Sequence, residues 1–469
     1  MSAAPFLKAM EWLFFGYFSA VYLVYAVLNV FAVFRIRRYL QVAELATADN
    51  VFSSLDLPVS VIVPAYNEST SIITSIRAML QIEYPDFEVI VVNDGSTDDT
   101  LQKLIDEFGM RPFPEAYRQR APCKPVRGLY KSARFPNLRV VDKENGGSKA
   151  DAMNGGINAC RYPIFCAVDA DSILQPDSLR RAVRPFLENP LTIATGGTVR
   201  IANGCIVRGG FLEKVRLPDN FLAAFQVIEY LRAFLYGRMG WTQMNAVLII
   251  SGAFGVFDKE AVVKVGGYRP DAIGEDMELV LRLHESYAAS GEPYKVTFVP
   301  DPICWTDAPE NLETLGKQRV RWQHGLGQAL TLHRGLLFNR KAGAVGWIAI
   351  PFFYVFELFG PVVEVGGYLF MTVAWLSGWL PWTTALTFFG LAIGLGVMLS
   401  TSAIVLEEMS FHVYPRLRDL LRLFGIAILE NFGYRQFTLW WRVKGLVGWL
   451  RGQAPEWGEM KRSASMSGQ

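Results

Sequence analysis

Cysteines are few in this sequence and none of them are paired by spacing. The five cysteines (Cys123, Cys160, Cys166, Cys205 and Cys304) are odd in number and include no C-x-x-C pair. This pattern argues against a disulfide framework and against a structural zinc site. All five lie in the central part of the chain. That part is therefore expected to face a reducing cytosol.

Charged residues are also scarce, and they are unevenly distributed. They make up 19% of the 469 residues, whereas hydrophobic residues make up 51%. The chain is too apolar for a typical soluble enzyme and too charged for an all-membrane transporter. Most charges lie in the middle section, so the sequence predicts one soluble domain flanked by membrane helices. The net charge of +2 gives no reason to expect a nucleic-acid partner.

The first long apolar run is predicted to be a membrane helix. Residues 12–34 contain no charge and are long enough to cross about 30 Å of hydrocarbon. Arg35, Arg37 and Arg38 follow at once, so the positive-inside rule places the end of this helix, and the domain after it, in the cytoplasm. A signal peptide fits less well, because its basic region should precede the apolar run rather than follow it.

Further apolar segments lie after the central section. Residues 380–406 are uncharged and are predicted to cross the membrane. Residues 344–379 are equally apolar but contain Glu357 and Glu364. They form either a broken span whose carboxylates line a channel, or an interfacial helix followed by a span.

The last stretch, residues 416–451, mixes arginine, glutamate and tryptophan with apolar residues. It is typical of amphipathic helices on the cytosolic surface, although residues 423–441 remain an alternative span. Three spans are predicted, or four with that alternative. The expected organisation is an N-terminal membrane helix (1–40), a cytosolic domain (55–335), membrane and interfacial helices (336–452) and a cytosolic tail (453–469).

The central section alternates short apolar runs with helical patterns. The runs are predicted strands at 59–63, 88–92, 138–141 and 164–168, and the helices between them lie at 69–81, 97–107 and 149–159. This alternation predicts an α/β fold with a mostly parallel, doubly wound sheet. Ligands of such sheets bind at the carboxyl ends of the strands.

An insertion rich in proline and arginine interrupts this alternation at residues 111–134. It is either a solvated loop or a segment that contacts anionic lipid headgroups.

Acidic residues follow the first two predicted strands. The sequence Pro-Ala-Tyr-Asn-Glu ends the first at Glu68, and Asn-Asp-Gly-Ser ends the second with Asp94. Carboxylates there can accept hydrogen bonds from a nucleobase imide or ribose hydroxyls. Helix capping explains Ser96 or Thr97 but not the two acids together. No G-x-G-x-x-G follows the first strand, so a nicotinamide or flavin cofactor loses its main support.

The fourth predicted strand runs into Asp169-Ala170-Asp171. Alternate residues of an extended segment share a face, so Asp169 and Asp171 can point at one spot. Two crowded carboxylates repel unless a cation lies between them, and oxygen ligands suit Mg²⁺ or Mn²⁺. Such an ion would bridge a diphosphate and neutralise it as it leaves.

A glycine-containing turn, Gly-Gly-Ser-Lys at residues 146–149, precedes the helix predicted at 149–159. Backbone N–H groups and the positive end of a helix dipole favour phosphate there, with Lys149 as the counter-charge. The alternative is a flexible turn with a surface lysine.

Glu275 and Asp276 lie just before a predicted helical run at 277–286. A partly desolvated carboxylate at this point could take a proton from an attacking sugar hydroxyl. Alternatively, both acids only stabilise the start of the helix.

Residues 318–322 form a Q-x-x-R-W motif next to a predicted membrane segment. Arg321 would clamp a leaving diphosphate, which a planar guanidinium suits. Trp322 offers an apolar face on which a pyranose can stack, although packing in the core or at an interface explains a tryptophan equally simply.

These motifs, in this order, make the chain resemble the processive, inverting family-two glycosyltransferases, the group of cellulose, chitin, hyaluronan and poly-N-acetylglucosamine synthases. The resemblance covers roughly residues 58–328 and the membrane architecture. It implies a cytosolic GT-A fold, a Rossmann-like, doubly wound mixed sheet with flanking transmembrane and interfacial helices. The tripeptide is Gly-Glu-Asp where many members have Thr-Glu-Asp, a change that keeps both carboxylates.

Residue roles carry over from the resemblance only where the motifs match. It implies that Tyr66, Glu68, Asp94, Lys149 and Asp169 surround a uridine diphosphate sugar. Asp171 would coordinate Mg²⁺ or Mn²⁺, and Asp276, beside Glu275, would be the general base. Arg321 would close the donor subsite, and Gln318 and Trp322 the acceptor subsite.

The implied function is a multi-pass inner (plasma) membrane enzyme that transfers sugar from UDP-N-acetylglucosamine or UDP-glucose to a growing β-linked polysaccharide. The polymer would be extruded across the membrane, with membrane lipids and accessory export proteins as partners. One alternative is a single-addition transferase acting on a lipid or lipid-linked acceptor. Another is a non-catalytic membrane scaffold, which predicts broken acidic motifs, and these motifs are intact.

Overall fold

A mixed β-sheet forms the centre of the protein, whose computed structural model describes residues 4–49, 56–114 and 118–453. Within these residues ten strands follow the order β3-β4-β5-β2-β1-β6-β11-β8-β12-β7. Their bounds are β1 Val59–Ala65, β2 Phe87–Asp94, β3 Met110–Pro112, β4 Val126–Ser132, β5 Leu138–Lys143, β6 Ile164–Val168, β7 Ile173–Leu174, β8 Thr192–Ile201, β11 Phe254–Asp258 and β12 Lys295–Thr306. A small separate hairpin joins β9 (Ile206–Arg208) to β10 (Phe211–Lys214).

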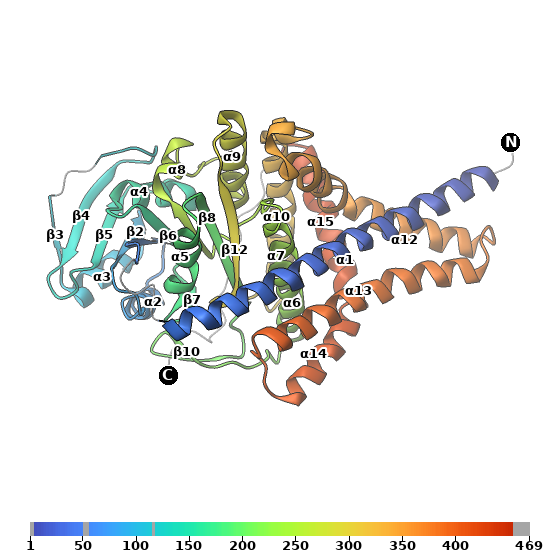
Figure 1. Ribbon diagram of the computed structural model, residues 1–469, viewed down its shortest axis with the longest axis horizontal. Helices are drawn as coiled ribbons and strands as arrows, with labels where there is room; N and C mark the ends of the chain where they lie inside the picture. Colours follow the sequence, from blue (N-terminus) through green and yellow to red (C-terminus); the bar gives the residue numbers. More distant parts are fainter. Residues whose placement is uncertain (1–3, 50–55, 115–117, 454–469) are drawn as a thin grey trace.

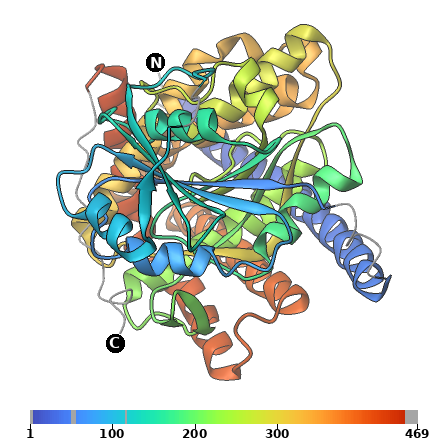
Figure 2. The same ribbon diagram turned by 90° about the vertical axis from the view of Figure 1, so that its left-hand side faces the viewer.

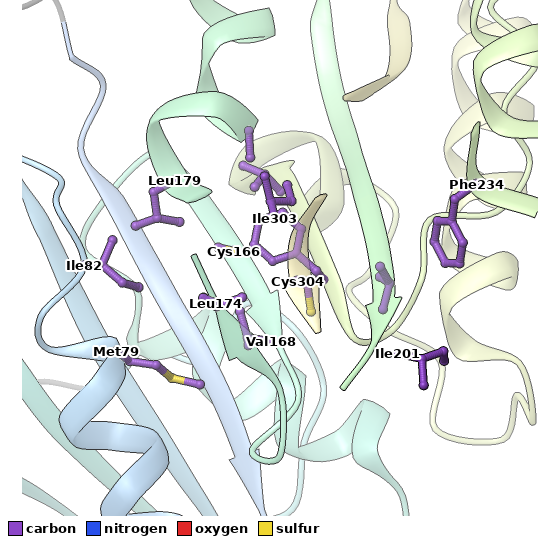
Figure 3. Packing of buried hydrophobic residues seen from close by; sticks show 14 of the residues in the cluster. Met79, Ile82, Cys166, Val168, Leu174, Leu179, Ile201, Phe234, Ile303 and Cys304 are labelled. Atoms are coloured by element: carbon purple, nitrogen blue, oxygen red, sulfur yellow. The ribbon is translucent and has the colours of Figure 1, made fainter. Parts of the chain in front are cut away.

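Strands β5, β2, β1 and β6 run parallel, as their apolar sequences predict. Alternate residues of each strand enter different cores because successive side chains of a strand point to opposite faces. Val61 and Val63 of β1 pack in one core, and Ile62 between them packs in the other. Figure 3 shows part of the first core, including Cys166 and Val168 of β6. The sheet is therefore doubly wound.

Helices cover both faces of the sheet, as Figure 2 shows from the β3 side. Buried residues of α2, α3, α5 and α6 pack in the first core, and those of α4, α8 and α9 in the second. The helices of this domain are α2 Ile72–Met79, α3 Thr100–Phe108, α4 Lys149–Ala159, α5 Ser178–Glu188, α6 Phe221–Leu231, α7 Met239–Thr242, α8 Lys259–Lys264, α9 Glu275–Ser290 and α10 Leu312–Leu332. The π-helical segment η1 (Arg232–Arg238) joins α6 to α7.

The insertion at 111–134 contains strand residues of β3 and all of β4, so the expectation of a loop is wrong for these strands, whereas residues 113–114 and 118–125 lie outside helices and strands. β4 pairs antiparallel with β5, and β3 pairs with β4, which extends the sheet by two strands. An edge strand exposes unpaired backbone N–H and C=O groups, and a further strand can form hydrogen bonds with them. Figure 1 places β3 and β4 at the end of the molecule farthest from the apolar helices. This position argues against contact with lipid headgroups.

Two helices are long and apolar enough to cross a membrane among the residues that the structure describes. They are 5–41 of α1 (Ala4–Asp49) and α13 (Trp382–Ser410), in agreement with the spans predicted at 12–34 and 380–406. Segment 345–358 and α12 (Gly360–Leu376) pass the same test together but are bent by 44° at their junction. The count is two spans, or three if this bent pair is one span.

The bend at the start of α12 releases carbonyl groups from the helix ladder, and side chains from other helices bind them. Gln323 Nε2 donates to the carbonyl oxygens of Glu357 (3.1 Å) and Leu358 (2.9 Å). Arg442 Nη2 donates to the same Glu357 oxygen at 2.6 Å, and Arg442 Nε donates to Gln323 Oε1 at 2.9 Å. The carbonyl groups at this bend therefore have hydrogen-bond partners, and the helix is not frayed there.

The glutamates at 357 and 364 are both ion-paired. Glu357 Oε2 lies 3.0 Å from Arg442, and Glu364 Oε2 lies 3.1 Å from Arg435. Both arginines belong to α15 (Tyr434–Leu450), and Glu357 Oε1 also accepts a hydrogen bond from Tyr25 of α1 at 2.7 Å. Each charge therefore has a partner, as charges in an apolar setting require.

The stretch after α13 forms two helices, α14 (Leu417–Leu429) and α15, separated near Gly433 with φ 95°. The alternative of one span over 423–441 is therefore wrong, and the placement of the two shorter helices on the cytosolic surface stays a prediction. α15 packs along α10, where Gly316 faces the indole of Trp441 and Gly327 that of Trp449. The tail at 453–469 lies, apart from its first residue, outside the described residues.

Candidate active site

The loops after β1 and β2 are joined at the carboxyl edge of the sheet. Asn67 has a left-handed backbone (φ 55°), and its N–H donates to Ser96 Oγ at 3.1 Å. Its side-chain oxygen accepts the N–H of Thr97 at 2.8 Å. These bonds hold Tyr66, half of whose surface is exposed, and Glu68 beside the loop that follows β2. The two strand ends are therefore adjacent, and a shared crevice for Glu68 and Asp94 stays a prediction.

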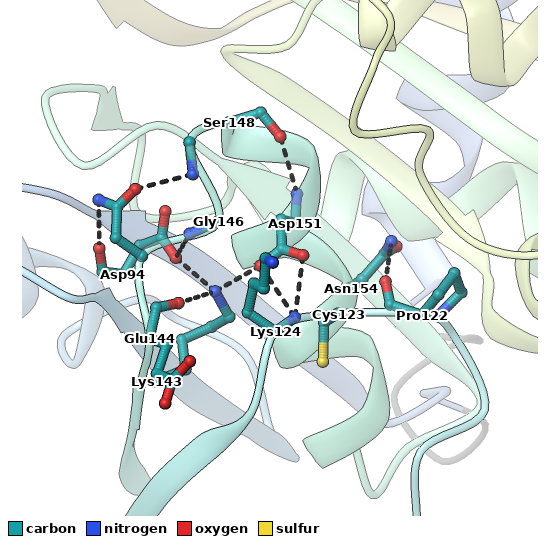
Figure 4. Close-up of polar contacts among 12 residues, drawn as sticks. Asp94, Pro122, Cys123, Lys124, Lys143, Glu144, Gly146, Ser148, Asp151 and Asn154 are labelled. Carbon is teal, nitrogen blue, oxygen red and sulfur yellow. Dashed lines mark hydrogen bonds and ion pairs between the residues drawn. The ribbon is translucent and has the colours of Figure 1, made fainter.

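Asp94, at the end of β2, is bound in a buried cluster (Figure 4). Lys143, which is fully buried at the end of β5, pairs with both Asp94 and Asp151. The N–H of Gly146 donates to Asp94 Oδ1 at 3.1 Å. One ammonium between two carboxylates leaves the cluster with a single net negative charge. A buried ammonium loses its hydration, and pairing with the two carboxylates offsets that cost.

Lys143 and Asp151 were not among the residues predicted for the site. The strand predicted at 138–141 stops short of Lys143, whereas β5 continues to it in register with β2. Asp151 lies three residues after Ser148, the N-cap of α4, and its N–H faces Ser148 Oγ at 3.4 Å. That spacing resembles a capping box and could have drawn attention to Asp151.

A second polar cluster forms around Gly252, just before β11. Lys149, the first residue of α4, pairs with Asp169 of the D-x-D and donates to the Gly252 carbonyl oxygen at 2.8 Å. The N–H of Gly252 donates to Asp276 Oδ2 at 3.1 Å. A methyl group built on Gly252 would lie 3.6 Å from Glu275 Oε1. The structure therefore brings four predicted site residues together around one glycine.

The prediction that Glu275 and Asp276 precede their helix is wrong, because α9 begins at Glu275. Acidic side chains in a first helical turn are stabilised by the helix dipole. Asp276 Oδ1 accepts the N–H of Met277 at 2.8 Å, so both of its oxygens are held by backbone donors. Backbone donors therefore orient this carboxylate.

Charges in this cluster influence one another. Burial, followed by repulsion from Asp276, raises the pKa of Glu275 to about 7, against the lowering effect of Lys149. Burial alone would lower the pKa of Lys149, but the neighbouring Asp169 and Glu275 raise it above its ordinary value. Lys149 is therefore a fixed cation, and Glu275 can hold a proton near neutral pH.

Asp169 and Asp171 occupy the turn that follows β6, where the Ser172 N–H donates to the Asp169 carbonyl oxygen at 3.0 Å. Within the described residues there is no group of three or more His, Cys, Asp or Glu that could hold a metal. Two carboxylates still fit Mg²⁺ or Mn²⁺, because such ions keep waters and take their remaining ligands from substrate phosphates. The donor set suits a metal that arrives with a diphosphate.

The Q-x-x-R-W helix α10 packs against the start of α9. A methyl group built on Gly325 would lie 3.1 Å from the N atom of Gly274, the N-cap of α9, so the two backbones nearly touch. Trp322 (45% exposed) and half-buried Arg321 lie one turn earlier. Gln318 Oε1 is buried, and no described residue bonds to it. The helix that carries the motif therefore contacts the start of the helix that carries Glu275 and Asp276.

Two family models match the chain over the motifs described above. The model described as "Glycosyl transferase family 2" matches residues 60–115. The model described as "Glycosyltransferase like family 2" matches residues 129–325. Together they run from β1 to the Q-x-x-R-W helix.

Curated relatives include two bacterial synthases. The poly-beta-1,6-N-acetyl-D-glucosamine synthase of Staphylococcus epidermidis is 28% identical over 308 residues, which cover 63% of this chain and 64% of that protein. The protein of the same name from Staphylococcus aureus (strain COL) is 29% identical over 57% of this chain and 54% of its own length. The matched region spans less than two thirds of each relative.

Solved structures with a similar chain course include two sugar-transferring proteins. A Pyrobaculum calidifontis mannosyltransferase in complex with GDP-Man and Mn²⁺ is 17% identical, with a TM-score of 0.49 over 92% of this chain and 100% of that chain. Glucosyl-3-phosphoglycerate synthase from Mycobacterium tuberculosis is 17% identical, with a TM-score of 0.34 over 59% of this chain and 79% of that chain. Both overlays are loose.

Proposed function

We propose that this chain is a family 2 glycosyltransferase that transfers a hexosyl group from a UDP-sugar to a growing polysaccharide. N-acetylglucosamine is the proposed sugar, because the curated relatives are named as synthases of its polymer. The observation that carries the proposal is the cluster around Gly252, in which a fixed cation and an oriented carboxylate lie within reach of one glycine.

Asp276 is the proposed general base. Its two oxygens each accept one backbone N–H, and a carboxylate has further lone pairs that can accept an acceptor hydroxyl. As the hydroxyl oxygen forms a bond to the anomeric carbon, its proton passes to Asp276 and the bond from that carbon to the diphosphate breaks. Attack opposite the leaving group inverts the anomeric centre, so an α-linked donor gives a β-linked product.

The leaving diphosphate is proposed to lie between the start of α4 and Arg321. Lys149 at the first position of α4 supplies a fixed positive charge, and N–H groups at a helix start favour phosphate. A divalent cation held by Asp171, with Asp169 beside it, would supply further charge against the departing oxygen. Tyr66, Glu68 and Asp94 are the proposed contacts of the nucleoside.

The acceptor is proposed to enter on the Trp322 side, where 45% of the residue is exposed and the indole can stack on a pyranose. We further propose that the enzyme is a multi-pass protein of the inner membrane with its catalytic domain in the cytoplasm. The two apolar helices and Arg35, Arg37 and Arg38 support this placement. Processive extension and export between the helices, with lipids and export proteins as partners, belong to the same proposal.

A direct test uses the full chain in detergent or lipid nanodiscs. Radiolabelled UDP-N-acetylglucosamine or UDP-glucose is supplied with Mg²⁺ or Mn²⁺, and the product is sized. A ladder or a high polymer supports the proposal. A single sugar on extracted lipid would replace it with the single-addition alternative, and no transfer from any UDP-sugar would overturn it.

The base is tested by Asp276→Asn, which keeps the shape of the side chain and can accept one of the two backbone N–H bonds, but cannot take up the proton. We expect kcat to fall by about 10²–10⁴-fold, the usual contribution of general-base catalysis. Donor binding, measured by equilibrium titration, should stay within about threefold of wild type. Full turnover in this variant would remove Asp276 from the mechanism.

A further inference from the structure

Arg319 lies inside the Q-x-x-R-W motif and is almost fully buried, at 3% exposure. Its guanidinium carbon lies 4.3 Å from the ring centre of Trp322, one turn further along α10. Positions three apart on a helix are neighbours, and a cation within about 6 Å of an indole face is attracted to it. The inner side of Trp322 therefore rests on a buried charge, while 45% of the residue is exposed.

The guanidinium of Arg319 is itself held from two other helices. Its Nη2 donates to Glu229 Oε2 of α6 at 2.7 Å. The same oxygen accepts the hydroxyl of Tyr434, the first residue of α15, also at 2.7 Å. Burial alone would lower the pKa of Arg319, but Glu229 raises it above its ordinary value, so the cation persists. Three helices thus fix the group beneath the indole.

Burying the Arg319 guanidinium lowers the stability of the fold, so stability alone does not explain why an arginine is present. Arg319 Nε and Nη1 are buried, and neither has a hydrogen-bond partner among the described residues. A buried ion pair rarely outweighs the desolvation of its charges, and unpaired N–H groups add to that cost. An apolar residue of similar volume would pack there without the penalty. The charge is better explained by what it does to Trp322.

We propose that Arg319 is a positioning residue that holds the Trp322 indole in the plane where it receives the acceptor sugar. Glu229 and Tyr434 in turn fix Arg319. The inference rests on the proposed function, because it needs a sugar acceptor at Trp322. Arg319 contacts neither substrate nor reacting atoms. Its effect passes through the tryptophan, so it acts on acceptor binding and leaves donor binding unchanged.

The test replaces Arg319 with methionine, which keeps the length and apolar bulk but removes the charge. Kinetics are measured with UDP-N-acetylglucosamine and with β-1,6-linked N-acetylglucosamine oligosaccharides as acceptors. We expect the acceptor KM to rise about threefold to tenfold, the range of one cation–π contact, and the donor KM to stay within twofold. Arg319→Lys keeps the charge and should restore part of the acceptor affinity, whereas a purely structural role predicts no such rescue.

A double-variant comparison tests whether the effect passes through the indole. Adding Arg319→Met to Trp322→Ala should raise the acceptor KM no further, because the ring that the arginine positions is already gone. Independent, additive effects would show that Arg319 acts elsewhere and would refute the inference.

A matched control breaks another buried pair of the same kind. Arg200 of β8 pairs with Glu407 of α13; both side chains are 2% exposed, and Arg200 Nε and Nη1 likewise have no hydrogen-bond partner among the described residues. Glu407→Gln should leave the acceptor KM at the wild-type value. If it raises that KM as much as Arg319→Met does, the loss reflects general helix packing, and the inference is wrong.

Binding measured without turnover separates this inference from the proposed function. Calorimetric titration of the oligosaccharides into wild type and Arg319→Met, both checked for monodispersity, should show the same threefold to tenfold difference. Wild-type protein that binds the acceptor but transfers no sugar would overturn the proposed function and leave the inference standing. Equal acceptor affinity in the two proteins would overturn the inference and leave the function standing.

Discussion

Gly252 bonds both the proposed phosphate-binding Lys149 and the proposed base Asp276. Adding one methyl group to this glycine should reduce turnover without unfolding the protein. The backbone of Gly252 is not in the left-handed region, so alanine is tolerated there. Its Cβ would lie 3.2 Å from Lys149 Nζ, 3.6 Å from Glu275 Oε1 and 3.8 Å from Asp276 Oδ2. Carbon contacts are favourable from about 3.5 Å, so the lysine must move by a few tenths of an ångström.

A displacement of about 1 Å in a catalytic geometry can cost about 10²-fold in rate. Scaled to a few tenths of an ångström, Gly252→Ala should lower kcat about threefold to tenfold. The free energy of unfolding should change by less than about 1 kcal/mol, because alanine stiffens the unfolded chain while the contact costs little. Initial rates with a UDP-sugar and thermal unfolding measure the two quantities.

Gly128→Ala is the matched control, since the nearest atoms to a Cβ there belong to the Tyr130 side chain, the closest at an ordinary 3.5 Å. Gly128 lies on β4, the second strand from the end of the sheet that lies away from the apolar helices (Figure 1). Its kcat should equal that of wild type. Undiminished kcat in Gly252→Ala would refute the crowding argument. An equal loss of kcat in Gly252→Ala and Gly128→Ala would also refute it. So would a loss of kcat in Gly252→Ala that is accompanied by lower thermal stability.

Two further predictions concern pH. Glu275 keeps its proton up to about pH 7 in the folded protein but loses it near 4.5 when unfolded. Its contribution to stability is therefore complete below pH 4.5 and is lost as pH rises towards 7. In wild type the unfolding temperature should fall over that window, and Glu275→Gln should make this fall less steep. An unchanged slope would contradict the raised pKa. His333, at the end of α10, bonds Glu278 (3.2 Å) and Glu285 (2.6 Å). Burial opposes its protonation, yet the two glutamates raise its pKa above 6.5. His333→Gln should therefore be less stable than wild type below pH 6.5, with the gap closing as pH rises past the folded pKa; a gap that widens at high pH would reverse the sign of this argument.

Short apolar runs predicted the strands, and a capping residue predicted the start of the helix that carries Lys149. The helix predicted at 149–159 matches α4 to the residue, because Ser148 caps it and glycines precede it. The strands predicted at 59–63 and 164–168 begin where β1 and β6 begin. The start of α9 was missed although acids in a first turn are a recognised helix signal, because Gly274 offers no side-chain cap.

Contacts between distant residues could not be predicted in the same way. Lys143 reaches Asp94 only because β5 pairs with β2 in one register, and a shift by one residue would turn the lysine to the other face. Glu229 and Arg319 are 90 positions apart, and neither belongs to a periodic pattern that names its partner. The sequence indicated the chemistry of the site, whereas pairing and packing determine which charges are neutralised.

The bend before α12 has a consequence for how a product could move. Gln323, the residue after Trp322, binds the two carbonyl groups that the bend releases, and Arg442 binds one of them as well. Sliding α10 past the bend would strand these groups in an apolar setting, at about 1–3 kcal/mol each. A sugar carries hydroxyl donors that can replace the lost bonds. Under the export proposed above, we therefore expect the bend to yield most easily when a glycan lies beside it, because the glycan hydroxyls can replace the lost hydrogen bonds.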